Sequence, residues 1–148
     1  MNNHPNDATL AAAQICHFPN ILLVDDDPFQ LECIRIMLRS LGILNVTEAT
    51  GGDQALQKIR ANRNYYDLML TDLHMPGMDG FQFLEALSTT GFAGGLIIVS
   101  GQEPDVLHAA SLVARLRRFV LCGTLVKPID RTVLSRMISD WAIDRKRS

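Results

Sequence analysis

The sequence has few cysteines and little imbalance of charge. Three cysteines occur in 148 residues, at positions 16, 33 and 122. Their odd number and wide spacing fit reduced thiols better than a disulfide framework or a zinc site, so a reducing, cytoplasmic location is expected. The net charge is -2, which gives no electrostatic reason to expect a nucleic acid or a membrane surface as a partner.

The sequence also lacks the pattern of a secretion signal or of a membrane span. The first 20 residues have no basic start, and their apolar stretch is short and rich in alanine. We expect residues 1–19 to form a flexible tail, in which a short helix over residues 9–16 would be marginal without a partner surface. The whole chain has 47% hydrophobic and 20% charged residues, which is typical of a soluble globular protein. We expect one domain at residues 20–143, followed by a polar ending at residues 144–148.

What the sequence does contain is a regular alternation of short apolar runs with segments of helical period. The runs cover residues 21–24, 46–49, 67–70, 95–99 and 120–126, and the helical segments cover residues 28–41, 53–61, 81–87, 104–116 and 131–141. Runs such as ILLV and LIIV are apolar throughout, which indicates parallel strands buried on both faces. Five units favour a doubly wound open α/β sheet over a barrel, which needs eight units and about 250 residues.

Local signals support the first helix at both of its ends. Asp27 stands before Pro28, and this pair places a capping carboxylate ahead of a proline at the first helical position. Gly42 follows the segment and suits a helix end. We therefore interpret Asp27 primarily as the N-cap of this helix.

Polar residues follow four of the five predicted strands. They are Asp25, Asp26 and Asp27 after the first strand, Thr71 and Asp72 after the third, Ser100 after the fourth and Lys127 after the fifth. In open parallel sheets, ligands bind outside the carboxyl ends of the strands, near the point where the strand order reverses. We therefore expect these side chains to form one site.

The residue types in this site point to phosphoryl chemistry. Carboxylates that converge on one point repel each other, and their pKa values rise unless a cation joins them. Mg²⁺ is the natural cation, because it is hard and takes oxygen ligands from one or two carboxylates and a phosphate. Lys127 would add a positive charge and Ser100 a hydroxyl donor, which together suit a transferring phosphoryl group.

Four segments of the sequence resemble, in order, the signature segments of two-component receiver domains. They are LLVDD at 22–26, LTDLHMPGMDG at 70–80, IIVSG at 97–101 and LVKPI at 125–129. Four ordered motifs at strand ends are far more specific than any one of them. The resemblance implies a flavodoxin-like fold with five parallel strands in the order 2-1-3-4-5. It also implies a signalling switch that catalyses only its own phosphorylation and dephosphorylation, rather than an enzyme.

The same resemblance implies a role for each residue of the site. Asp72 would be the phosphoacceptor, taking its phosphoryl group from a phosphohistidine of a sensor histidine kinase or a phosphotransfer protein. Mg²⁺ would be held by Asp26 and Asp72 directly, by Asp25 mainly through bound water, and by the main-chain carbonyl of His74. Ser100 and Lys127 would hold the phosphoryl oxygens, because phosphoryl transfer requires mainly positioning and neutralisation of charge.

Two further positions follow from the resemblance. Pro128 should follow a cis peptide bond that directs Lys127 inward. Gly101 is small and should leave the acceptor open to a donor protein. His74 and Gln102, two residues beyond Asp72 and Ser100, occupy places that in the family modulate the lifetime of the phosphoaspartate.

The sequence departs from the family pattern at the switch position. Three residues before the lysine the family usually has an aromatic residue, and this chain has Thr124. An aromatic rotamer switch is therefore excluded. Movement of Ser100 towards the phosphoryl group could still reshape the face formed by the fourth helix, the fifth strand and the fifth helix. That face would contact an unknown output protein or domain, or a second copy in a homodimer.

The spacing between two site residues is also unusual. Lys127 follows Ser100 by 27 residues, several more than in a typical receiver, and the extra length falls around the fourth helix. With the segment VLCGTLVKPI, this spacing resembles receivers attached to cyclic-di-GMP phosphodiesterase domains of the EAL type.

Two alternatives compete with a phosphorylated switch. A phosphatase of the haloacid dehalogenase type also uses an aspartyl nucleophile and Mg²⁺, with Asp25 and Asp27 as its paired acids, but Phe29 stands where a small residue should follow and Asp72 would have no role. A receiver fold kept only as a binding module, without phosphorylation, is the second alternative. The intact set of acids, hydroxyl and lysine argues against it.

Overall fold

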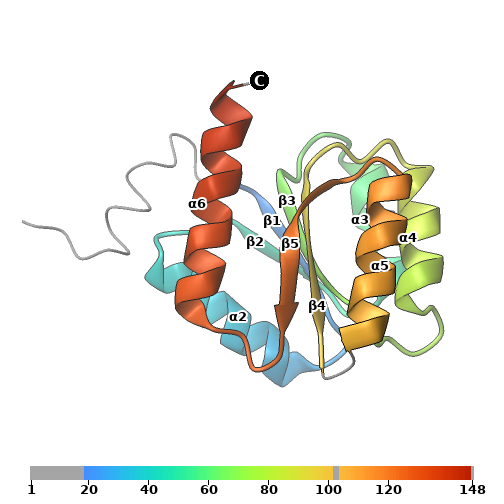
Figure 1. Cartoon of the computed structure of the whole chain (residues 1–148), viewed down its shortest axis with the longest axis horizontal. Helices are drawn as coiled ribbons and strands as arrows, with labels where there is room; N and C mark the ends of the chain where they lie inside the picture. Colours follow the sequence, from blue (N-terminus) through green and yellow to red (C-terminus); the bar gives the residue numbers. More distant parts are fainter. Residues whose placement is uncertain (1–18, 102–103, 148) are drawn as a thin grey trace, which may run out of the picture.

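The structure, a computed structural model, describes residues 19–101 and 104–147. In these residues five strands alternate with five helices (Figure 1). The strands are β1 (Ile21–Val24), β2 (Val46–Ala49), β3 (Leu68–Asp72), β4 (Gly95–Ser100) and β5 (Val120–Val126), and the helices are α2 (Pro28–Ser40), α3 (Gly52–Ala61), α4 (Gly80–Ser88), α5 (Pro104–Leu116) and α6 (Arg131–Arg147). Nearly all of the predicted tail, its short helix and Gln102 lie outside the described residues.

The five strands form one parallel sheet in the order β2-β1-β3-β4-β5. The predicted flavodoxin-like fold and strand order are thus confirmed. In the centre of the sheet, Val24 of β1 lies opposite Thr71 of β3, and Asp72 lies opposite Val99 of β4. The carboxyl ends of β1, β3 and β4 therefore meet at one edge, which we call the carboxyl edge.

Helices cover both faces of the sheet (Figure 1). Helices α2 and α6 pack on one face in a core that includes Ile21 and Leu23 of β1, and α3, α4 and α5 pack on the other face with Leu22 and Val24. Successive side chains of a strand point to opposite faces. Because both faces are covered, every residue of ILLV is buried, which explains why the run is apolar throughout.

Helix α2 has the ends that the sequence predicts. Asp27 is its N-cap, and the Asp27 carboxylate accepts the backbone N–H of Phe29 at 2.9 Å. At the other end Gly42 has a φ of 85°, and the N–H groups of Gly42 and Ile43 donate to the carbonyls of Arg39 and Leu38. This is the pattern of a Schellman motif, in which glycine takes a left-handed conformation at little cost.

Helix α6 is longer than predicted. The sequence predicts an end at residue 141, but the helix continues to Arg147, so the polar ending begins inside it. Trp141 and Ala142 are buried in the core, and Arg145 pairs with Asp67 at 2.9 Å. The apolar stripe alone did not reveal that Ala142 still joins the core or that Arg145 holds the end of the helix to Asp67. None of the helices in the described residues is long and apolar enough to cross a membrane.

Strand β5 contains a bulge near its start. Leu96 lies opposite Leu121, but Ile97 lies opposite Gly123, so Cys122 is an extra residue in the ladder. Gly123 has a φ of 158°, and a Cβ atom there would lie 2.6 Å from the methyl carbon of Met137 on α6. The absence of a side chain at Gly123 thus leaves room for the end of the Met137 side chain.

Candidate functional site

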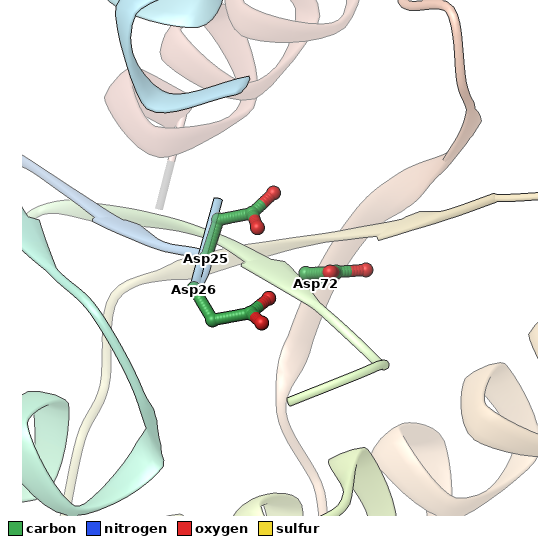
Figure 2. Close-up of side chains that lie close together, drawn as sticks. All are labelled: Asp25, Asp26 and Asp72. Carbon is green, nitrogen blue, oxygen red and sulfur yellow. The ribbon is translucent and has the colours of Figure 1, made fainter. Parts of the chain in front are cut away.

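Three aspartates come together at the carboxyl edge of the sheet. Asp25 and Asp26 follow β1, and Asp72 ends β3. One carboxylate oxygen from each lies within 4.8 Å of the others, and Figure 2 shows the three carboxylates gathered on one side of the two strand ends. Asp25 and Asp72 are buried, with 2% and 5% of their surface exposed, while Asp26 is exposed.

The buried position of Asp25 makes its charge unfavourable. Burial raises the pKa of Asp25 above its ordinary value, and the charge of Asp72 raises it further, although the N–H of Asp27 and the ammonium group of Lys127 oppose the rise. The N–H of Asp27 donates to Asp25 Oδ1 at 2.9 Å. A cation bound between the carboxylates would offset the remaining electrostatic cost of the Asp25 charge.

Lys127 provides one positive charge to this cluster. Its Nζ lies 3.1 Å from Asp25 Oδ2 and 3.3 Å from Asp72 Oδ2. Burial alone would lower the pKa of Lys127, but the hydrogen bond to Asp25 and the charges of both carboxylates outweigh it and raise the pKa above its ordinary value. Lys127 is therefore a protonated ammonium at neutral pH, placed between two acids that lie far apart in the sequence.

The backbone at the end of β5 fixes this lysine. The N–H of Lys127 donates to the carbonyl of Ser100 at 2.8 Å, which extends the pairing of β4 with β5 by one residue. The peptide bond between Lys127 and Pro128 is cis, as predicted. Because Lys127 is held to β4, which pairs with β3, its side chain begins beside the end of the strand that carries Asp72.

Two polar atoms at this edge have no hydrogen-bond partner within the described residues. They are Asp72 Oδ1 and Ser100 Oγ, and both are buried. A buried polar atom without a partner costs about 1–3 kcal/mol, so native proteins rarely keep one unless a ligand, a water molecule or an ion completes it. These two atoms therefore indicate that a ligand, a water molecule or an ion binds at the carboxyl edge.

The donor set fits a hard divalent cation. Three carboxylates supply oxygen ligands, as Mg²⁺ prefers, and the exposed side of the cluster leaves room for the water molecules that Mg²⁺ keeps. Asp25, Asp26 and Asp72 lie close together, and their roles as metal ligands stay predictions. His74 lies on the exposed loop after β3, and the ligand role of its carbonyl stays a prediction.

The loop after β3 is held by contacts that sequence reasoning missed. The N–H of Gly80 donates to the carbonyl of Leu73 at 3.0 Å, and a Cβ atom on Gly80 would lie 2.9 Å from the Leu73 Cα. Asp79 caps α4 and forms a capping box with Gln82. The spacing of Asp79 and Gln82 is a readable signal for a helix start, whereas only the three-dimensional structure shows why residue 80 is glycine.

The remaining predicted site residues surround the cluster. Gly101 is half-buried, and a Cβ there would meet no atom of the described residues within 4 Å. Thr124 lies on β5 opposite Ile98 and is half-buried. The alternation of β5 directs Thr124 away from the face that buries Leu125 and towards α5. Their roles as an access point and as a switch stay predictions.

Comparisons with known proteins agree with this geometry. A profile of the response regulator receiver domain matches residues 21–139. Two-component response regulator ORR22 of Oryza sativa subsp. indica is 43% identical over 110 residues, which are 74% of this chain and 15% of that protein. The autoinducer 1 sensor kinase/phosphatase LuxN of Vibrio campbellii is 27% identical over 123 residues, which are 83% of this chain and 13% of that protein.

A solved structure supports the same relationship. The response regulator receiver domain protein from Clostridium thermocellum superposes with a TM-score of 0.70 at 28% identity, covering 86% of this chain and 95% of the other. The chain spans only 15% of the length of its rice relative, so the comparison concerns one domain. The family profile and the similarity to the rice protein together show that this chain belongs to the response regulator receiver domain family.

Proposed function

We propose that this receiver is a Mg²⁺-dependent phosphorelay switch in which Asp72 accepts a phosphoryl group from a phosphohistidine. The observation that carries the proposal is the state of the Asp72 carboxylate. One oxygen, Oδ2, lies 3.3 Å from the ammonium group of Lys127, while the other, Oδ1, is buried and has no partner among the described residues. An oxygen in that state has a lone pair free to attack phosphorus.

In the proposed reaction, a carboxylate oxygen of Asp72 forms a bond to phosphorus while the bond from phosphorus to the donor's imidazole nitrogen breaks. The imidazole leaves with the electron pair of that bond and takes up a proton. Lys127 and the Ser100 hydroxyl hold the equatorial oxygens, which carry the spread charge of the transition state. Bound Mg²⁺ would supply the additional positive charge that offsets the carboxylates of Asp25 and Asp26.

The new phosphoryl group would then compete for the groups that now face Asp72. Ser100 Oγ is free to donate to it, because it has no other partner in the described residues. A shift of Ser100 would pull on β4, which pairs with β5 through Thr124 and Leu125. The switch would thus act through the packing of β5 between α5 and α6, without an aromatic side chain.

The partners follow from the family. A sensor histidine kinase or a histidine phosphotransfer protein is the proposed donor, and the proposed output is a protein or domain, or a second copy, bound at the face of α5, β5 and α6. A cytoplasmic location fits this role. The relation to receivers attached to EAL-type phosphodiesterases rests on the 27-residue spacing from Ser100 to Lys127, a span that includes α5 and the bulged β5.

Mass spectrometry after treatment with acetyl phosphate and Mg²⁺ tests the proposal. The wild-type protein should carry one phosphoryl group on Asp72, and Asp72→Asn should carry none. Asp27→Asn is the matched control, because asparagine caps a helix as well as aspartate does, and it should be modified like the wild type. A phosphoryl group on Asp25 would instead support the haloacid dehalogenase alternative. No adduct from any donor, with partner binding intact, would support a binding module.

A further inference from the structure

A cavity of about 790 Å³ lies at the end of the sheet away from Asp72. We call this end the amino edge, because β3, β4 and β5 begin there. The cavity is lined by Gly95 and Val120, the first residues of β4 and β5, by the loops at residues 62–67 and 90–94, and by α6. In Figure 1, α6 rises past the amino ends of the strands. The volume of the cavity is in the range of ligand-binding pockets.

The walls of this cavity are largely apolar. Trp141 and Met137 of α6 and Leu121 and Cys122 of β5 line it. Val120 and Val133 also line it, and they are 54% and 44% exposed. Large apolar side chains that are exposed together around a hollow indicate a surface that something covers.

The charged groups around the cavity balance each other. Three arginines and three aspartates line it: Arg63, Arg136, Arg145, Asp67, Asp140 and Asp144. Arg145 pairs with Asp67 at 2.9 Å. A balanced rim offers no net attraction to a strongly charged ligand, so an uncharged, apolar occupant fits this cavity better.

The chain enters the fold at the rim of this cavity. The backbone N–H of Asn20 donates to Asp67 Oδ2 at 2.9 Å, and the side-chain amide of Asn20 donates to the carbonyl of Tyr65 at 3.2 Å. Asp67 is one of the lining residues. The 18 residues before Pro19 lie outside the described structure, and even an extended chain keeps residues 10–18 within about 30 Å of Pro19.

The composition of that segment matches the cavity. Residues 8–18 contain no aspartate, glutamate, lysine or arginine. They include Leu10, Ile15 and Phe18, whose side chains are of the kind that gains most from leaving water. We propose that residues 8–18 bind in the cavity at the amino edge of their own chain and cover the apolar surface between α6 and β5.

Alkylation of the cysteines by N-ethylmaleimide tests this intramolecular docking in the full chain. Cys122 lines the cavity, whereas Cys33 of α2 lies near Phe29 and Pro128 at the other end of the molecule. The rate at Cys122 relative to the rate at Cys33 therefore reports whether the cavity is covered. Ile15→Asp should raise this ratio by about twofold or more, because it removes the cover from an apolar surface.

Asn3→Asp is the matched control, because it adds the same charge outside residues 8–18. It should leave the ratio unchanged. Equal ratios in the wild type, Ile15→Asp and Asn3→Asp would overturn the proposal. Both variants should still unfold in one cooperative thermal transition, which shows that the core is intact.

Disulfide formation with diamide identifies the occupant. Diamide takes two hydrogens from two thiols, and a docked segment should give a Cys16–Cys122 disulfide faster than a Cys16–Cys33 disulfide. A mixture of ¹⁵N-labelled and unlabelled protein separates the two sources. A disulfide within one chain supports the proposal, and a disulfide between labelled and unlabelled chains would overturn it in favour of a second copy. Neither result depends on Asp72.

Discussion

The two edges of the sheet both hold a cation beside a carboxylate, but in very different surroundings. At the amino edge, Arg145 pairs with Asp67 while its side chain stays 54% exposed, and the second Asp67 oxygen accepts the N–H of Asn20. At the carboxyl edge, Lys127 lies between two buried carboxylates, and Asp72 Oδ1 has no partner in the described residues. The first pair is complete as it stands. The second leaves a buried carboxylate oxygen without a partner in the described residues, and this difference supports the carboxyl edge as the candidate site.

The largest effect is expected from Lys127→Met, which removes the cation of the carboxyl edge and keeps a similar side-chain length. The rate of Asp72 phosphorylation by acetyl phosphate should fall by roughly 10²–10³-fold, as when one group that stabilises transition-state charge is lost. Lys58→Met on α3 is the control and should keep the wild-type rate. Equal rates for the two variants would show that Lys127 has only a structural role.

Mg²⁺ should stabilise the protein through the carboxyl edge. At a concentration about 100 times its dissociation constant, a ligand specific for the folded state raises the free energy of unfolding by about 2.7 kcal/mol, measured by urea unfolding with and without the ion. Asp26 is exposed, so Asp26→Asn should change the metal-free stability little and weaken the response to Mg²⁺. An undiminished response in this variant would contradict the predicted ligand set.

The sequence predicted most of this comparison but not all of it. Strand ends such as Asp25 and Asp72 could be read because buried parallel strands are apolar throughout and end where polar residues begin. The sequence could not show that Asp26 is exposed while Asp25 is buried, since both follow the same strand. The close approach of Gly80 to Leu73 and the length of α6 also depend on contacts between distant segments, which local patterns do not encode.

The pH dependence of stability should reveal the buried charge of Asp25. Burial raises the pKa of this group in the folded state above the unfolded value near 3.8, so the folded state binds more protons. Stability from this group is present at low pH and is lost as the pH rises through the folded pKa. Without metal, wild-type protein should therefore lose stability relative to Asp25→Asn as the pH rises from about 4 to 7, as measured by urea unfolding. A constant difference would contradict the raised pKa.

The smallest effect is expected at the amino edge. Arg145→Ala removes the pair with Asp67 and the contact of the guanidinium with the Trp141 ring, whose centre lies 5.3 Å away. Because Arg145 is mostly exposed, the loss should be less than about 1 kcal/mol in urea unfolding, and Asp72 phosphorylation should be unaffected. A larger loss would mean that the two edges differ less in energy than their burial indicates.

The bulge at Cys122 separates the length of β5 from the placement of its lysine. If the same residues paired without a bulge, an unbroken ladder would set Ser100 opposite Leu125, and Thr124 and Leu125 would exchange faces. A bulge takes up one inserted residue and leaves the pairing downstream unchanged. The segment before the bulge can therefore change in length, in evolution or by protein engineering. Lys127 would keep its position beside Asp72.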